Sequence, residues 1–426
     1  MRRSESVRAS MISVDEALNY ILSHIEPLPA EKVELLEGLD RILAEDIVAD
    51  INIPPFPNSA MDGYAVRASD TAGASPNAPV ELRVIEEVAA GAVPQAEIIP
   101  GTAARIMTGA PMPRGADAVV RFEDTSEGRE ALHNSIVRIY KAASPMQNVR
   151  PAGEDIRRGQ RVLEAGRLLR PQELGVLAAL GRPTVRVHRR PRVALLATGD
   201  ELVDIDEEIA PGKIRNINEY TTAAQVRRYG GVPVQLGIAR DTVEDLTRKI
   251  RAGLEQDVDL FLTSAGVSIG DYDVVKNVLA AEGEMHFWQV AIKPGKPLAF
   301  GQIAGVPVLG LPGNPVAAMV AFEVFARPAI RKMSGWTRWE KPRIRATLRE
   351  DVTNSGRRHY MRAVVFRSEA GYEVTTRGDT VAVQGSGILT SMVWANAFLV
   401  VPEGETFLPA GSQVEVEMLD WPETVF

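Results

Sequence analysis

The spacing of apolar residues predicts a helix near the start of the chain. Apolar side chains recur there at intervals of three or four positions, at Val14, Ala17, Leu18, Ile21, Leu22 and Ile25. This spacing places them on one helical face. Ser13 and Glu16 have the spacing of a capping box, and Pro27 and Pro29 end the pattern. An amphipathic helix is therefore expected to begin after Ser13.

Short, valine-rich apolar runs separated by Gly and Pro predict a small β domain over residues 55–158. The closely spaced prolines of residues 53–57 exclude helix and indicate a crossing between domains. Helical periodicity returns at Pro171, which suits the first helical position, and ends at Gly181. Residues 11–54 and 159–190 are therefore expected to form one helical and extended domain that carries the β domain as an insertion.

Strand and helix patterns alternate over residues 191–339, as in successive βαβ units. Strands are expected at 193–196, 233–236, 260–262, 287–292 and 306–309. One helix should end at Tyr229 before Gly230, one should begin near Asp241 and Thr242, and a last one should begin at Asn314 and Pro315. This alternation predicts a parallel sheet covered by helices on both faces.

Beyond Pro342 the pattern changes to short strands between Gly and Pro turns, which predicts a C-terminal β domain over residues 340–426. The expected fold is therefore a multi-domain α/β plus β chain. Its central domain, residues 191–339, is doubly wound and mostly parallel. A β-rich insertion, a helical and extended N-terminal segment and a β-barrel-like C-terminal domain surround it.

Composition narrows the chemistry that this fold can perform. No apolar run approaches the roughly 18 residues of a membrane helix, and the opening residues lack the apolar block of a secretory signal, so the cytoplasm is expected. The chain contains no cysteine, which excludes thiolate metal sites and a thiol nucleophile. Its five histidines have no metal-ligand spacing, and none is assigned a role. The net charge of −8 argues against nucleic acid and anionic membranes as partners.

A ligand site is expected in the loops that follow the strands, because open parallel sheets bind ligands beyond the carboxyl ends of their strands. Four such loops stand out, at residues 198–202, 263–270, 292–297 and 311–315. They should converge on one rim of the sheet. The second loop leads small and hydroxyl residues into a helix, where backbone N–H groups can approach phosphate, although it could equally be a plain strand-to-helix turn.

Two lysines on the third loop indicate an anion site. Lys293 and Lys296 flank a Pro-Gly turn that would fix both ammonium groups close together, although a structural ion pair is the alternative. Binding a small dianion at micromolar affinity needs about 8 kcal/mol, and one charge-assisted hydrogen bond contributes roughly 1.5 to 3 kcal/mol. Two lysines are therefore too few, and donors from another segment are required.

Carboxylates beside these loops suit Mg²⁺, which takes hard oxygen ligands together with water and substrate phosphate. Glu201, Asp241, Asp271 and Asp273 are the candidates. Asp241 and Asp271 each precede an expected helix and could instead cap it, so Glu201 is the better metal ligand. Asp62 lies in a short apolar run without a helix, where a turn role is the ordinary explanation.

With these residues in view, the chain resembles the molybdopterin molybdenumtransferases, a family that includes the C-terminal E domain of gephyrin and its plant counterpart. The resemblance runs from about residue 11 to the C-terminus. It rests on six strings in order, at residues 58–64, 105–110, 153–155, 198–202, 292–297 and 311–315. Several such strings in this order are very unlikely by chance.

The resemblance implies a Mg²⁺-dependent transferase that takes molybdate and adenylated molybdopterin and releases molybdenum cofactor and AMP. It implies a homodimer in which the α/β part of one chain and a β part of the other share an active site, with residues 11–54 and 159–190 serving dimerisation. It also implies transient contact with a molybdopterin adenylyltransferase and with molybdoenzyme chaperones.

The resemblance further assigns residues to roles. The molybdate pocket would contain Lys293, Lys296, Pro297, Arg362 and Ser386. Catalytic work is implied for Asp62, Thr108, Asp155, Glu201, Asp241 and Asp273, with Glu201 and Asp241 as Mg²⁺ ligands. Substrate and phosphate contacts are implied for Thr198, Gly199, Ser264, Gly266, Ser268, Pro312, Gly313 and Asn314.

Several alternatives remain open at the level of sequence. Matching the family's Asp-Tyr dipeptide favours Asp271 as the functional acid, whereas an ungapped alignment favours Asp273. Ala265 stands where the family usually has glycine. The rival functions are adenylation of molybdopterin and a non-catalytic scaffold of the gephyrin type. Molybdate and tungstate have nearly the same size and charge, so the sequence does not distinguish them.

Overall fold

The computed structural model describes residues 11–128, 136–264, 283–377 and 384–420. These residues form two compact units. The first contains the described residues of Met1–Lys32, Asp40–Ala44 and Arg186–Phe426, and the second contains those of Val33–Leu39 and Glu45–Val185. The finer division into four domains stays a prediction. No helix in the described ranges is long and apolar enough to span a membrane.

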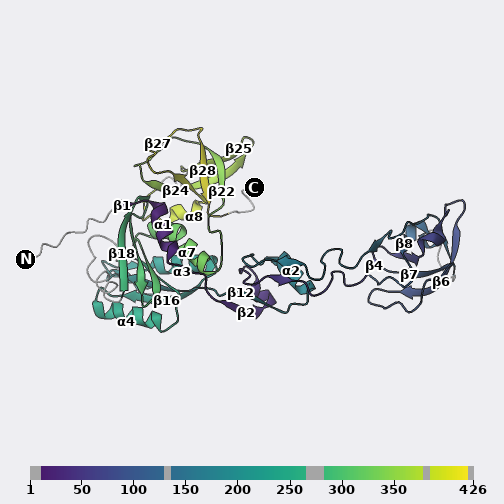
Figure 1. Cartoon of the computed structure of the whole chain (residues 1–426). Coiled ribbons are helices and arrows are strands. Elements are labelled where there is room, and N and C mark those ends of the chain that lie inside the picture. The colour runs from purple at the N-terminus through teal and green to yellow at the C-terminus, as the bar shows by residue number, and fades with distance from the viewer. Residues whose placement is uncertain (1–10, 129–135, 265–282, 378–383, 421–426) are drawn as a thin grey trace, which may run out of the picture. The chain divides into compact units, whose positions relative to one another are not determined.

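A seven-stranded sheet organises the first unit (Figure 1). Its strands, in spatial order, are β1 (Met11–Ile12), β18 (Gly283–Val290), β20 (Pro297–Ile303), β21 (Val306–Leu311), β17 (Leu260–Ser264), β13 (Arg192–Thr198) and β16 (Val232–Ala239). Neighbouring strands are parallel except where β20 meets β18 and β21. The sheet is therefore mostly parallel, as predicted.

The antiparallel strand β20 is the exception in this mostly parallel sheet. The sequence around Lys293 indicates a loop and does not predict the strand that follows it. Two turns reverse the chain at its ends. Val290 N–H donates to Lys296 O at 2.8 Å before β20, and Ala304 and Gly305 adopt φ values of 50° and 82° after it. Two consecutive positive φ values produce a tight hairpin.

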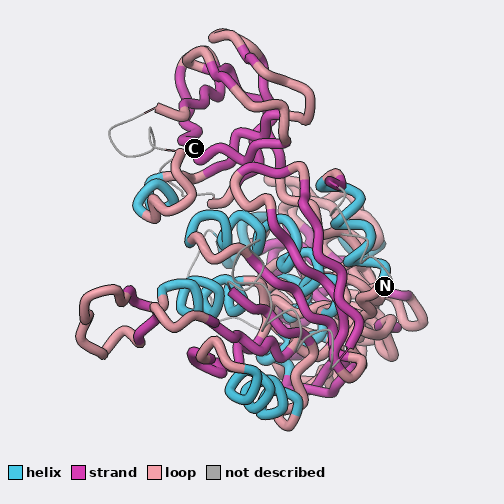
Figure 2. Tube along the Cα trace, turned by 90° about the vertical axis from the view of Figure 1, so that its left-hand side faces the viewer, coloured by secondary structure: helices cyan, strands magenta, loops and turns pink. Residues whose placement is uncertain are grey.

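Helices cover both faces of this sheet (Figure 2). Alternate residues of β13 point to opposite sides: Val193 and Leu195 contact one apolar cluster, and Ala194 and Leu196 contact the other. The first cluster includes residues of α1 (Val14–Ser23), α3 (Ile217–Arg228), α6 (Pro315–Ala321), a π-turn (Phe322–Ala326) and α7 (Arg327–Met333). The second includes residues of α4 (Val243–Leu254). This arrangement is the doubly wound fold that the alternating pattern predicted.

Several predicted helix ends are confirmed. The Ser13 side chain accepts from the Glu16 N–H, and the Glu16 carboxylate accepts from the Ser13 N–H, so α1 has its capping box. Gly230 follows α3 with a φ of 88°. The last helix begins at Pro315, as expected, but Asn314 makes no side-chain capping bond to it.

A C-terminal barrel completes the first unit. Its strands are β22 (Arg343–Leu348), β24 (Arg358–Ser368), β25 (Gly371–Thr375), β26 (Ala397–Val401) and β28 (Gln413–Met418), and the pairing of β24 with β26 closes the ring. The short strand β19 (Ile292–Lys293) pairs with β24, and the helix α8 (Thr390–Trp394) precedes β26. Short pairs are formed by β14 (Leu202–Val203) with β15 (Ile214–Arg215) and by β23 (Val352–Thr353) with β27 (Phe407–Leu408).

The second unit is built on a five-stranded sheet. Its strands, in spatial order, are β8 (Ala118–Arg121), β5 (Gly63–Val66), β7 (Thr102–Ile106), β6 (Val80–Val88) and β9 (Ile136–Ile139). Two-stranded pairs join β4 (Asn58–Ser59) to β10 (Val149–Arg150) and β3 (Ile47–Val48) to β11 (Arg161–Leu163). The predicted helix is α2 (Pro171–Ala179), with proline in its first turn. The strands β2 (Ala30–Glu34) and β12 (Thr184–His188) pair with each other, and each has residues in both units.

Candidate active site

A pocket of about 930 Å³ lies where strand ends of the seven-stranded sheet meet the barrel. Loops at all four predicted positions contribute residues to its wall, so their predicted convergence is seen among the described residues. Nine of the predicted site residues line it: Glu201, Ser264, Lys293, Lys296, Pro297, Pro312, Gly313, Asn314 and Ser386. Gly266, Ser268 and Asp273, together with Ala265 and Asp271, lie outside the described residues.

The two lysines of the pocket sit on a turn that packs against the loop after β21. Gly295, between them, has a φ of 96°, and a side chain there would meet Pro312 Cγ at 3.3 Å. Glycine at this position therefore lets the two loops lie side by side. Lys293 is the last residue of β19 and pairs in register with His359 of the barrel. The lysine turn is thus fixed from both sides.

Ser386 joins the barrel to the start of α6. The Val316 N–H donates to Ser386 O at 3.0 Å, and Asn314 Nδ2 lies 3.2 Å from Ser386 Oγ. The side chain of Asn314 therefore contacts the barrel instead of capping its own helix. On the other side of the same loop, Asn218 Nδ2 donates to Gly313 O at 2.7 Å.

Arg362 is placed behind the pocket wall rather than in it. Its side chain is fully buried and does not line the described part of the pocket. Its Nη2 donates to Gly385 O at 3.1 Å and its Nε donates to Ser391 Oγ at 3.1 Å. Burial lowers its pKa to about 10, which leaves it charged at neutral pH. Arg362 therefore supports the segment that presents Ser386.

Sequence reasoning missed three further cations of the pocket. Lys213, Arg215 and Arg357 line it together with the two lysines, and Glu201 is the only acidic residue in its described lining. Lys213 Nζ donates to Asp200 O, and Arg357 Nη1 donates to Ile292 O at 3.1 Å. The described lining thus contains five cationic residues and one carboxylate, in a chain whose net charge is −8. Lys213 and Arg357 lie on loops and Arg215 ends the short strand β15, and the sequence around them has no recognisable phosphate pattern.

His359 was also missed, because no role was assigned to any histidine. It is 2% exposed, and neither ring nitrogen has a hydrogen-bond partner within the described ranges. Burial first, and then the charges of Lys293, Arg362 and Arg357, lower its pKa to about 3. A neutral imidazole therefore lies in register with Lys293 and adds no positive charge.

The acidic loop residues lie at neighbouring strand ends. Asp241 Oδ2 accepts from the Asp200 N–H at 3.3 Å, which links it to the loop of Glu201. Thr242, not Asp241, caps α4, so the capping explanation for Asp241 is wrong. Gly199 has a φ of 142° and the Glu201 carboxylate folds over it, and Thr198 is buried. In the described ranges, no group of three or more His, Asp or Glu side chains converges as a metal site.

Asp62, Thr108 and Asp155 belong to the second unit. Asp62 Oδ1 accepts from the Thr108 N–H at 2.7 Å and from Thr108 Oγ1 at 2.8 Å, and these bonds lower its pKa. Both residues are exposed. The Asp155 N–H donates to Ile53 O at 3.0 Å. The structure therefore brings Asp62 and Thr108 together, in a pair that joins two loops.

The fold and the pocket define a multi-domain α/β protein with a pocket rich in cationic side chains. Three family profiles match successive parts of the chain. They describe the MoeA N-terminal region (domains I and II) over residues 12–181, a probable molybdopterin binding domain over residues 194–332, and the MoeA C-terminal region (domain IV) over residues 345–419.

Whole-length relatives agree with these profiles. The chain is 36% identical over 411 residues to the molybdopterin molybdenumtransferase of Haemophilus influenzae, covering 96% of this chain and 98% of that one. It is 38% identical over 416 residues to molybdopterin molybdenumtransferase 2 of Mycobacterium tuberculosis, covering 95% and 99%. A solved structure of a molybdopterin biosynthesis moeA protein from Pyrococcus horikoshii has a TM-score of 0.82 and 34% identity, covering 97% of this chain and 100% of that chain. The chain belongs to the molybdopterin molybdenumtransferase family, and it is a transferase of molybdenum cofactor biosynthesis.

Proposed function

We propose that this chain transfers molybdate into adenylated molybdopterin in a Mg²⁺-dependent reaction that yields molybdenum cofactor and AMP. The observation that carries the proposal is the pocket, whose described lining contains five cationic side chains and one carboxylate. An oxyanion and a phosphate-bearing substrate both need such a surplus of positive charge.

Molybdate would bind between the lysine turn and the barrel. Lys293 and Lys296 supply two ammonium groups, Pro297 borders them, and Ser386 supplies a hydroxyl. Arg362 contributes by holding the Gly385 carbonyl, which fixes the neighbouring Ser386. With Arg357 as a further cation in the lining, the pocket reaches the three to five donors that micromolar binding of a dianion requires, at roughly 1.5 to 3 kcal/mol for each bond.

The volume of the pocket, about 930 Å³, far exceeds that of a small oxyanion and leaves room for the organic substrate. Its anhydride phosphates would lie near Lys213 and Arg215, which line the same pocket. Thr198, Gly199, Ser264, Gly266, Ser268, Pro312, Gly313 and Asn314 are proposed to shape this region.

Glu201 and Asp241 would hold Mg²⁺. Both are exposed carboxylates at neighbouring strand ends, and the hydrogen bond from Asp200 to Asp241 keeps the two loops together. Two carboxylates suit an ion that completes its shell with water and substrate phosphate. When bound, the ion would supply Lewis-acid polarisation of a phosphoryl oxygen. Asp273 is proposed as a further acid of this region.

We also propose that the chain acts as a cytoplasmic homodimer. Asp62, Thr108 and Asp155 of one chain would then meet the pocket of the other. Transient contacts with a molybdopterin adenylyltransferase and with molybdoenzyme chaperones would deliver substrate and receive product. The proposal includes neither nucleic acid nor a membrane as a partner.

The test is AMP release from adenylated molybdopterin by the purified chain with Mg²⁺, with and without molybdate. Release should require molybdate. It should be lost in Lys293→Ala/Lys296→Ala and kept in Lys141→Ala, which removes an exposed lysine of the second unit. If AMP never appears, or if ATP is consumed to adenylate free molybdopterin, the proposal is wrong.

A second variant tests the proposed catalytic role of Glu201. Glu201→Ala should lower turnover by about a hundredfold or more while the unfolding temperature stays nearly unchanged, because an exposed carboxylate contributes little to stability. Equal losses of turnover and stability would contradict a catalytic role for Glu201. Circular dichroism melts beside the AMP assay separate the two outcomes.

A further inference from the structure

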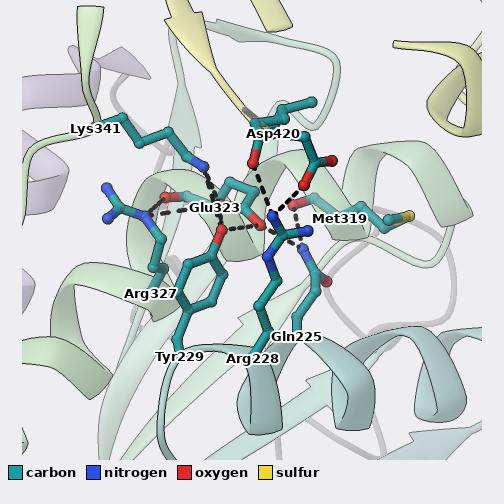
Figure 3. Close-up of polar contacts among 9 residues, drawn as sticks. Gln225, Arg228, Tyr229, Met319, Glu323, Arg327, Lys341 and Asp420 are labelled. Carbon is teal, nitrogen blue, oxygen red and sulfur yellow. Dashed lines mark hydrogen bonds and ion pairs between the residues drawn. The ribbon is translucent and has the colours of Figure 1, made fainter. Parts of the chain in front are cut away.

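A buried charged cluster lies at the far end of the helix that starts in the pocket (Figure 3). Glu323 sits in the π-turn between α6 and α7 and is 5% exposed. Its carboxylate accepts from Tyr229 Oη at 2.8 Å and from Gln225 Nε2 at 3.0 Å, and it lies 2.7 Å from Lys341 Nζ. We call Gln225, Tyr229, Glu323, Arg327 and Lys341 the Glu323 cluster.

The Glu323 cluster connects two parts of the first unit. Gln225 and Tyr229 belong to α3 and its end, and Glu323 and Arg327 belong to the helix beside it. Lys341 belongs to the connection that enters the C-terminal barrel two residues before β22. The side chains of Lys341 and Glu323 are each 6% exposed, and burial lowers the pKa of Lys341. Breaking such a buried pair leaves an uncompensated charge.

A second contact fixes the chain where it leaves the barrel, after its last strand. Arg228, next to Tyr229, donates to Leu419 O at 2.9 Å and to the Asp420 carboxylate. Leu419 directly follows β28, the last strand of the barrel. The chain is therefore attached to α3 and its neighbouring helix both where it enters the barrel and where it leaves it.

The same helix carries the pocket at its other end. Pro315 and Ala317 of α6 line the pocket, and Val316 N–H donates to Ser386 O of the barrel. Glu323 follows Pro315 by eight positions, which is about 12 Å of helix. The barrel thus contacts one continuous helix at the pocket and again at the Glu323 cluster.

We propose that Glu323 and Lys341 are positioning residues for the oxyanion pocket. By fixing the barrel on the helix, they set the place of Ser386 and Gln384 relative to Lys293 and Lys296. Misplacement by about 1 Å can cost a site up to a hundredfold in function. The inference rests on the proposed molybdate site, and no residue of the Glu323 cluster belongs to the described lining of that pocket.

The test measures molybdate binding by calorimetry on the full chain. Lys341→Met and Glu323→Gln should each raise the Kd for molybdate at least about tenfold. The matched control is Glu350→Gln, a buried carboxylate whose bonds to Thr375 and Thr376 stay within the barrel. It should lower the unfolding temperature while its Kd stays within about twofold of the wild-type value.

The double variant Glu323→Gln/Lys341→Met separates positioning from stability. It removes both charges, so it should recover much of the stability that each single variant loses. Its Kd for molybdate should remain raised, because the barrel is no longer fixed by the ion pair. A wild-type Kd in the double variant would overturn the proposal and leave the proposed function standing.

Spin labels give a second readout, since the chain has no cysteine of its own. Val393→Cys on the barrel side and Val243→Cys on α4 are both exposed and provide the label sites. The distance distribution should broaden in Lys341→Met and stay narrow in Glu350→Gln. Unchanged distributions in both variants would refute the inference. Absence of molybdate binding by the wild type would refute the proposed anion site instead.

Discussion

His359 shows how a single residue links the pocket to stability. In the unfolded chain an imidazole binds a proton below about pH 6.5. In the folded protein burial and the charges of Lys293, Arg362 and Arg357 lower the pKa of His359 to about 3. Folding must therefore release a proton between these two pH values. The stability contributed by the neutral ring is complete above about pH 6.5 and is lost as the pH falls toward 3.

His359→Gln should remove this dependence. The stability advantage of the wild type over the variant should shrink by about 2 kcal/mol between pH 7 and pH 5, since one pKa unit corresponds to about 1.4 kcal/mol. Urea unfolding at several pH values measures it. Parallel pH profiles for the two proteins would contradict a neutral buried imidazole.

The pocket residues also show what sequence could and could not predict. Lys293, Lys296 and Ser386 were placed at an anion site, and the structure brings all three to one pocket. Arg362 was expected as a direct donor, but it lies behind the wall, because its distance from a ligand depends on how the segment of Gly385 folds. Lys213 was missed, since only the path of the chain after β14 carries it into the pocket.

At the scale of elements, the close pairing of β5 with β8 explains why position 63 is glycine. Gly63 of β5 pairs with Arg121 of β8, and a Cβ atom at Gly63 would lie 2.0 Å from Val120 O. A backbone carbonyl inside a sheet cannot move away without breaking the pairing. Gly63→Ala should therefore lower the free energy of unfolding by more than about 3 kcal/mol in urea.

Gly175 is the matched control for this prediction. It lies within α2 and needs no positive φ, and a Cβ atom added there would meet no atom of the described residues within 4 Å. Gly175→Ala should raise stability by roughly 0.5 to 1 kcal/mol, because alanine loses less backbone entropy in a helix. If both variants behave alike, steric contact at Gly63 is not the cause.

Local signals explain which elements were predictable. The capping box of α1 and the proline in the first turn of α2 fix helix starts within a few residues, and both were recognised. Strand β20 was missed because its direction depends on turns at both ends. One of these turns holds Ala304 at a φ of 50°, a conformation that alanine rarely adopts. Gly305 favours this turn locally, but the conformation of Ala304 is imposed by the pairing of β20 with β21.

At the scale of the whole molecule, the question is whether Asp62 and Asp155 of the second unit complete the pocket of their own chain or that of a partner chain. Asp62 and Thr108 form one bonded pair in that unit, whereas Lys293 and Lys296 line a pocket of the first unit. The proposed dimer joins the acids of one chain to the pocket of the other. Mixing two inactive variants distinguishes this arrangement from a site within one chain.

Asp62→Ala and Lys293→Ala/Lys296→Ala should each be inactive alone. If the pocket of each chain is completed by Asp62 of the other chain, a mixed dimer has one site with only wild-type residues and one site with every substitution. Unfolding and refolding an equal mixture should therefore restore about a quarter of the wild-type sites, because half of the dimers are mixed under random pairing. A site within one chain would restore none, since each chain carries a defect. AMP release measured before and after subunit exchange distinguishes a site shared between two chains from a site within one chain. Each variant unfolded and refolded alone gives the baseline.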